Sequence, residues 1–250
     1  MFGIELTALA AVTVAFVFGG FAKGATGIGL PVVAIAIMAN VLEPRLALAS
    51  LIMPALATNV WQAARSEDFF RPLKRFWPMV VCFLATLLIF ARVMAKLDTG
   101  VLFAILGGVL VLFSVLNLWR PHTPPLTART QRWAGPVAGL LGGTLGGLTS
   151  IWGPPMIMYL VMLRLDKDEW VRTVGFIWGM GVIPLTYAYW QNGVLNPDSL
   201  PLSLYACVPA LAGTMIGEAA RNRINQELFR KALVGFLLII GFNLIRRGLM

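Results

Sequence analysis

Long stretches without a charged residue dominate this chain. Most of them are close to the roughly 20 residues that an α-helix needs to cross the hydrocarbon core of a bilayer. The pattern therefore predicts an all-α, polytopic integral membrane protein. The uncharged runs are Leu6–Ala22, Gly24–Leu42, Leu46–Ala64, Phe76–Ala91, Thr99–Trp119, Trp133–Leu163, Thr173–Pro197, Ser199–Gly217 and Ala232–Ile245.

One of these runs is too long for a single span. Trp133–Leu163 covers 31 residues and is interrupted near its centre by several glycines and a pair of prolines. Because proline and clustered glycines break helices, we expect two segments there. This makes ten segments, five on each side of a proline-rich stretch. It predicts a first transmembrane repeat over 1–119, a cytoplasmic linker over 120–132 and a second transmembrane repeat over 133–250.

Composition excludes the common soluble classes. The chain is 58% hydrophobic and 12% charged, with 20 Lys and Arg against 11 Asp and Glu, whereas soluble domains contain about 25% charged residues. The basic residues lie in short clusters and form no continuous basic face, so we expect no nucleic-acid partner. The two cysteines are far apart and form no CxxC motif. No metal or other cofactor is predicted.

A glycine-rich motif recurs at an offset of 123 residues. The segment GFAKGATGIGLP matches GTLGGLTSIWGP at four turn-type residues with the same spacing. Such duplication is typical of transporters built from two related halves. The matched pairs are Gly20 with Gly143, Gly24 with Gly147, Thr26 with Thr149, and Pro31 with Pro154.

The basic residues between the segments indicate that the second half is inverted. With ten crossings, fourteen Lys and Arg fall on one side and five on the other, leaving out Lys23. With four crossings in each half, the division becomes nine against ten. Cytoplasmic loops contain the excess of positive charge. We therefore expect inverted repeats, with both termini on the periplasmic or extracellular side of the cell (inner) membrane.

The two motifs predict broken or re-entrant helices. The expected breaks are residues 24–29 before Pro31 and residues 146–153 before Pro154, because proline is tolerated in the first turn of a restarted helix. A helix that restarts inside the membrane presents unpaired N–H groups and partial positive charge, which can bind an anion. The predicted anion-binding residues on the motifs are Gly24, Thr26, Gly27, Gly29, Gly147, Thr149, Ser150, Trp152 and Gly153.

Two cationic residues complete the predicted site. Lys23 is a lone ammonium between apolar residues, and a charged residue within a span is a functional-site hypothesis by default. The alternative is that its side chain snorkels to the interface. Arg172 is a second predicted ligand, although a topology signal explains it equally well. For the glycines, tight helix packing is the alternative to a binding role.

These features resemble the sulfite exporter TauE/SafE family of membrane permeases. The resemblance depends on GGFAKGATGIGLPVVAI near the start, GLLGGTLGGLTSIWGPPMIMYLV in mid-chain and LDKDEWVRTVGFIW after it. It implies secondary transport of small sulfur-containing or organic anions, such as sulfite, a sulfonate or sulfoacetate, across the bacterial cytoplasmic membrane. Members are usually described with about eight spans, fewer than the ten segments expected here.

The leading hypothesis is a secondary transporter that works by alternating access, with the anion held at the N-termini of the broken helices. A passive anion channel or a membrane partner subunit is the alternative. An embedded enzyme is disfavoured, because the chain has a single histidine, His122, and neither a GxSxG nor an HExxH motif. The expected partners are the small anion and membrane lipid. A coupling proton or cation and a homo-oligomer are left open.

Overall fold

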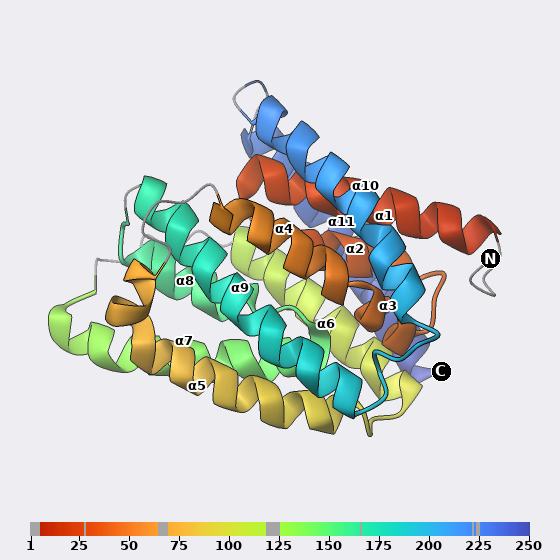
Figure 1. The fold of residues 1–250 in the computed structure, drawn as a ribbon, viewed down its shortest axis with the longest axis horizontal. Coiled ribbons are helices and arrows are strands. Elements are labelled where there is room, and N and C mark those ends of the chain that lie inside the picture. The colour runs from red at the N-terminus through yellow and green to blue at the C-terminus, as the bar shows by residue number, and fades with distance from the viewer. Residues whose placement is uncertain are drawn as a thin grey trace.

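The chain folds into a bundle of helices (Figure 1). The computed structural model describes residues 6–27, 29–64, 70–118, 126–165, 167–221, 223 and 226–250, and this part contains helices and turns without strands. It confirms the all-α class. The helices are α1 (Leu6–Thr26), α2 (Leu30–Met38), α3 (Pro44–Ser50), α4 (Ile52–Ala64), α5 (Arg71–Met94), α6 (Thr99–Leu118), α7 (Ala128–Thr149), α8 (Gly153–Met162), α9 (Lys167–Gln191), α10 (Leu200–Ala220) and α11 (Gln226–Leu249).

Several of these helices are suited to a bilayer. Within the described residues, five helices are long and apolar enough to cross a membrane, and α8 is a shorter apolar helix. This confirms the prediction of a polytopic membrane protein. The five candidate spans are Thr7–Thr26, Arg71–Met94, Thr99–Leu116, Leu200–Ala220 and Lys231–Leu249.

The order of the helices repeats at the offset seen in the sequence. In each half a long helix is followed by a short one. The next segment is the long helix α9 in the second half and the two shorter helices α3 and α4 in the first. Three boundaries recur 123 residues apart. They are Thr26 and Thr149 at the ends of α1 and α7, Leu30 and Gly153 at the starts of α2 and α8, and Pro44 and Lys167 at the starts of α3 and α9.

The two halves exchange equivalent helices. α1 packs along α10 and α7 packs along α5, while α6 packs along α11. Gly100 lies against Gly248, and Gly107 against Gly241, so α6 and α11 run in opposite directions. In Figure 1, α1 and α7 also enter from opposite ends of the molecule. These relations are those of an inverted pair of repeats, as the distribution of charge predicted.

Glycines of the repeated motif make the exchanged pairs possible. A Cβ atom on Gly20 would lie 2.2 Å from the carbonyl oxygen of Ala210, and one on Gly143 would lie 2.2 Å from that of Phe83. Side chains at these positions would therefore push the helices apart. Small residues four apart are a common device for close helix contact in membranes, so packing is the main role of these glycines.

The helix breaks are shorter than the sequence suggested. Gly24 and Gly147 lie inside α1 and α7, which continue to Thr26 and Thr149. A Cβ on Gly24 would meet the backbone of α10, and one on Gly147 the backbone of α5. These glycines are required by a neighbouring helix and do not unwind their own. The breaks are residues 27–29 and 150–152, of which Ile28 lies outside the described residues.

The expected linker is also shorter at its carboxyl end. α7 begins at Ala128, so residues 128–132 are helical. The Thr127 side chain caps this helix by accepting a hydrogen bond from the Thr130 amide at 3.2 Å. Residues 119–125, including His122, lie outside the described part of the chain.

Replacing Gly20 with alanine tests the packing role. We expect Gly20→Ala to destabilise the protein by about 1–3 kcal/mol, because the added methyl group overpacks the contact with α10. Gly108→Ala is the matched control, since a Cβ there meets no atom within 4 Å. The control should be neutral or stabilising by up to about 1 kcal/mol. SDS-induced unfolding of both variants measures this, and equal stability would contradict the packing role.

Candidate functional site

Both helix breaks have the same backbone construction. Gly27 ends α1 with φ of 86°, and Ser150 ends α7 with φ of 58°. The Gly27 amide donates to the Lys23 carbonyl oxygen at 2.7 Å, and the Ser150 amide donates to that of Gly146 at 2.8 Å. The left-handed residue therefore completes the last turn of each helix.

The threonine before each break bonds back to its own helix. The Thr26 hydroxyl donates to the carbonyl oxygen of Ala22 at 2.8 Å, and the Thr149 hydroxyl to that of Leu145 at 2.7 Å. Thr149 Oγ1 also accepts the amide hydrogen of Ile151. We predicted both threonines as anion ligands, but in this structure their hydroxyl hydrogens stabilise the helix ends.

The chain restarts as a helix directly after each break. Pro31 is the second residue of α2 and Pro154 is the second residue of α8. A missing N–H has little consequence in a first turn, because the first amides of a helix have no partner within it.

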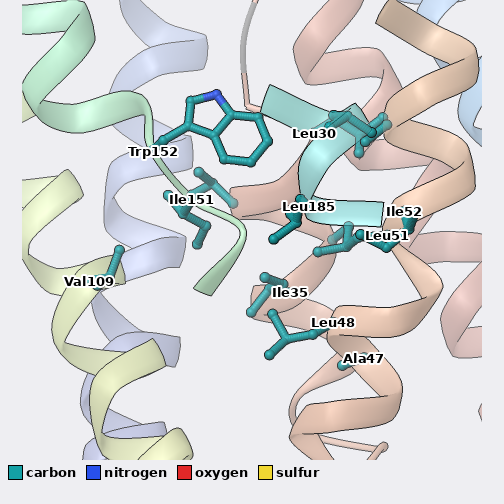
Figure 2. Packing of buried hydrophobic residues seen from close by; sticks show 14 of the residues in the cluster. Leu30, Ile35, Ala47, Leu48, Leu51, Ile52, Val109, Ile151, Trp152 and Leu185 are labelled. Carbon is teal, nitrogen blue, oxygen red and sulfur yellow. The ribbon is translucent and has the colours of Figure 1, made fainter. Parts of the chain in front are cut away.

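A small enclosed cavity lies where the two breaks meet. In Figure 2, Trp152 from the second break lies on one side of this region and Leu30 at the start of α2 lies on the other. The cavity volume of about 10 Å³ is close to what one water molecule needs. A molecule larger than water therefore does not fit this cavity in the structure. The lining residues are Lys23, Gly29, Leu30, Pro31, Ala55, Asn59, Trp152 and Trp178.

Lys23 provides the positive charge of this cavity. Its side chain is only 6% exposed, which excludes snorkelling in this structure. Its Nζ donates to Thr58 Oγ1 at 3.0 Å and to Asn59 Oδ1. The Thr58 hydroxyl donates to the Pro54 carbonyl oxygen, so its oxygen is left to accept. Glu218 of α10 attracts the ammonium electrostatically without bonding to it.

Aromatic rings form the opposite lining of the cavity. Trp152 is 2% exposed, and its ring makes edge-to-face contacts with Phe83 at 5.7 Å and with Trp178 at 6.3 Å between centroids. Its buried Nε1–H has no hydrogen-bond partner among the described residues. Buried donors are nearly always paired. This donor is therefore an exception that lies on a residue of the cavity lining.

The other predicted ligands lie outside the cavity lining. The Ser150 hydroxyl is hydrogen-bonded to the Tyr189 hydroxyl at 3.0 Å. Gly153 is buried as the first residue of α8. Gly27 is also buried, although an added Cβ there would meet no atom within 4 Å. Arg172 lies in the second turn of α9 and does not line the cavity. The structure thus brings together Lys23, Gly29, Pro31 and Trp152 from the predicted set.

Four residues that line the cavity were not in the predicted site: Leu30, Ala55, Asn59 and Trp178. Of these, Asn59 and Trp178 have polar atoms in their side chains. Asn59 comes from α4 and Trp178 from α9, and each belongs to a helix that follows its motif by many residues. The sequence has no spacing signal that places these helices beside the breaks. A polar Asn within an apolar run was the one available indication.

A larger open pocket is a poorer candidate for anion binding. It has a volume of about 440 Å³ and is lined in part by Glu43, Arg45, Asn196 and Asp198. Two carboxylates against one guanidinium give it a negative balance, which repels anions.

Comparison with known protein families gives a match over most of the chain. The family model described as Sulfite exporter TauE/SafE matches residues 12–244. No curated protein and no solved structure matches the chain.

Two substitutions of Ser150 test the geometry of the second break. Ser150→Ala should destabilise the protein by about 1–3 kcal/mol, because it leaves the buried Tyr189 hydroxyl without its partner. Ser150→Gly loses the same bond but relieves the left-handed backbone, so it should be about 1–2 kcal/mol more stable than Ser150→Ala. SDS-induced unfolding compares the two variants. A glycine variant less stable than the alanine variant would contradict this assignment.

Proposed function

The chain belongs to the sulfite exporter TauE/SafE family of membrane permeases, and we propose that it transports a small sulfur-containing or organic anion through the cavity between the helix breaks. Sulfite, a sulfonate and sulfoacetate are the candidate substrates. The observation that carries the proposal is the buried Lys23 side chain, which within the described residues is hydrogen-bonded to the neutral oxygen atoms of Thr58 and Asn59 and, when charged, has Glu218 as an electrostatic neighbour. A buried cation in a membrane is costly without a counter-charge. A bound anion would supply one.

Other groups around the cavity favour the same ligand. The unpaired indole N–H of Trp152 is available as a donor to an anionic oxygen. Leu30 and Pro31 belong to the first turn of α2, where free amides and the helix dipole attract negative charge. The cavity thus combines one full charge, one side-chain donor and a helix N-terminus.

The arrangement of the helices suggests which parts move. α1, α2, α3, α4 and α10 pack together as a first bundle, and α5, α7 and α8 pack together as a second, while α9 packs against both α4 and α5. The cavity lies between the bundles: Lys23 and Asn59 come from the first, Trp152 from the second and Trp178 from α9. Each bundle contains helices from both halves of the sequence. We infer that these mixed bundles rock against each other to give alternating access. The closed cavity favours such a carrier over an open channel.

The basic loops suggest the orientation of the protein. The fourteen basic residues counted above lie in the connections after α4, α6, α8 and α10 or in the first two turns of the helices that follow them. The positive-inside rule favours a cytoplasmic position for this side of the protein. Figure 1 shows both termini together at the other end of the molecule. We infer a multi-pass protein of the cell (inner) membrane with both termini outside the cytoplasm.

Exchange of labelled sulfite by purified protein in liposomes tests transport and the role of Lys23. The wild type should show saturable uptake of labelled sulfite when unlabelled sulfite is inside. Lys23→Met should lower that rate at least about tenfold, because the charge that binds the anion is lost. Lys74→Met is the matched control, since Lys74 is exposed on α5.

The controls separate the possible failures. Each variant must keep its elution position and thermal stability in detergent, so that loss of exchange does not reflect misfolding. Equal exchange by wild type and Lys23→Met would remove Lys23 from the site. Absence of saturable exchange with sulfite, a sulfonate or sulfoacetate would overturn the proposed function.

A pair of reporters fused after Met250 tests the orientation. We expect alkaline phosphatase activity and no fluorescence from green fluorescent protein at this position, because the first reporter folds only outside the cytoplasm and the second only inside. Fusions in the loop after Arg221 should give the opposite result. A fluorescent carboxyl-terminal fusion would contradict the topology.

A further inference from the structure

The hydrogen bonds of Lys23 match a neutral amine better than an ammonium. A charged lysine has three N–H donors, whereas its neutral form has two. In the closed cavity, Nζ bonds to two acceptors, Thr58 Oγ1 and Asn59 Oδ1. Within the described residues no third acceptor is bonded to it. A third N–H would therefore remain unpaired until an anion arrives.

Two charged groups lie near Lys23, one on α10 and one directly after that helix. Glu218 of α10 attracts the charged form of Lys23 electrostatically. Arg221 donates through Nε and a terminal nitrogen to the Gly24 carbonyl oxygen at 3.1 and 2.6 Å. α4 faces Lys23 with the uncharged Thr58 and Asn59, and the described parts of α2 and α9 at the cavity contribute only apolar or aromatic residues.

We propose, on the basis of the transport function above, that Lys23 carries a proton through the transport cycle. Water on the open side of the membrane gives the amine a proton, which creates both the third N–H and the positive charge that the anion needs. After the cavity opens to the opposite side of the membrane and the anion leaves, the amine gives its proton to water on that opposite side. The neutral amine keeps its bonds to Thr58 and Asn59, so the empty carrier moves back without a buried charge. One proton thus travels with each anion in the same direction.

Lys23→Arg tests this mechanism because arginine stays protonated. The variant keeps the charge, so it should still exchange labelled for unlabelled sulfite across liposomes. Without a bound anion, the variant must change from one open side to the other while its arginine charge is buried. Net uptake into sulfite-free liposomes, which needs this step, should therefore fall at least about tenfold relative to exchange. The wild type should show comparable rates in the two assays. Sulfite in solution is protonated to the same extent in the assays of both proteins. Its own protonation therefore does not affect the comparison of net uptake with exchange.

Asn59→Asp provides an independent variant of similar shape. A carboxylate beside Lys23 holds the ammonium in the empty carrier and also repels the anion. Net uptake should therefore be slower than in the wild type, and the uptake that remains should lose its acceleration by an inward proton gradient. Lys74→Arg, on the exposed surface of α5, should behave as the wild type in each assay.

The outcomes separate this proposal from the proposed function. No saturable exchange by the wild type overturns both. Wild-type exchange, together with an unchanged ratio of net uptake to exchange in Lys23→Arg, overturns proton carriage by Lys23 and leaves anion transport intact. If Lys23→Arg does not fold, Asn59→Asp decides, and an unaltered response to the proton gradient in that variant overturns the proposal.

Discussion

A helix whose end is buried must satisfy its last carbonyl groups from within the protein, because water does not reach them there. The rest of this structure follows from that constraint. Gly27 and Ser150 turn back so that their amides bond to the preceding turn. Arg221, from the end of α10, covers the carbonyl oxygen of Gly24. Such coverage needs a neighbouring helix at close range, and the glycines of α1 and α10 provide it.

The exchange of helices between the halves places both breaks at one interface. α1 is held by α10 and α7 by α5, so each broken helix packs against a continuous helix of the other half. The breaks then face each other between two mixed bundles, where a small relative movement opens or closes the cavity. A chain whose halves packed only within themselves would not combine their helices in this way.

The two halves have equivalent helix breaks, but the side chains around these breaks differ. At equivalent positions, the first half has polar groups where the second has small or apolar residues, and the second has indole rings where the first has small residues. A Cβ on Gly146 would meet the Trp152 ring at 2.9 Å, so the bulk of one residue depends on the smallness of another. The result is one asymmetric site instead of two equal ones. The equivalent pairs are Lys23 with Gly146, Asn59 with Val182, Gly29 with Trp152, and Ala55 with Trp178.

The sequence by itself determined the membrane class, the duplication, the inversion and Lys23 as the unusual cation. These depend on hydrophobic length and on charge placement, which act along the chain through partition into the bilayer. Only the tertiary structure decided that Gly24 packs while Gly27 turns, that Lys23 is buried, and that Asn59 and Trp178 join the site while Arg172 does not. The physical reason is that each of these depends on which distant backbone lies alongside, and no local pattern of residues encodes that.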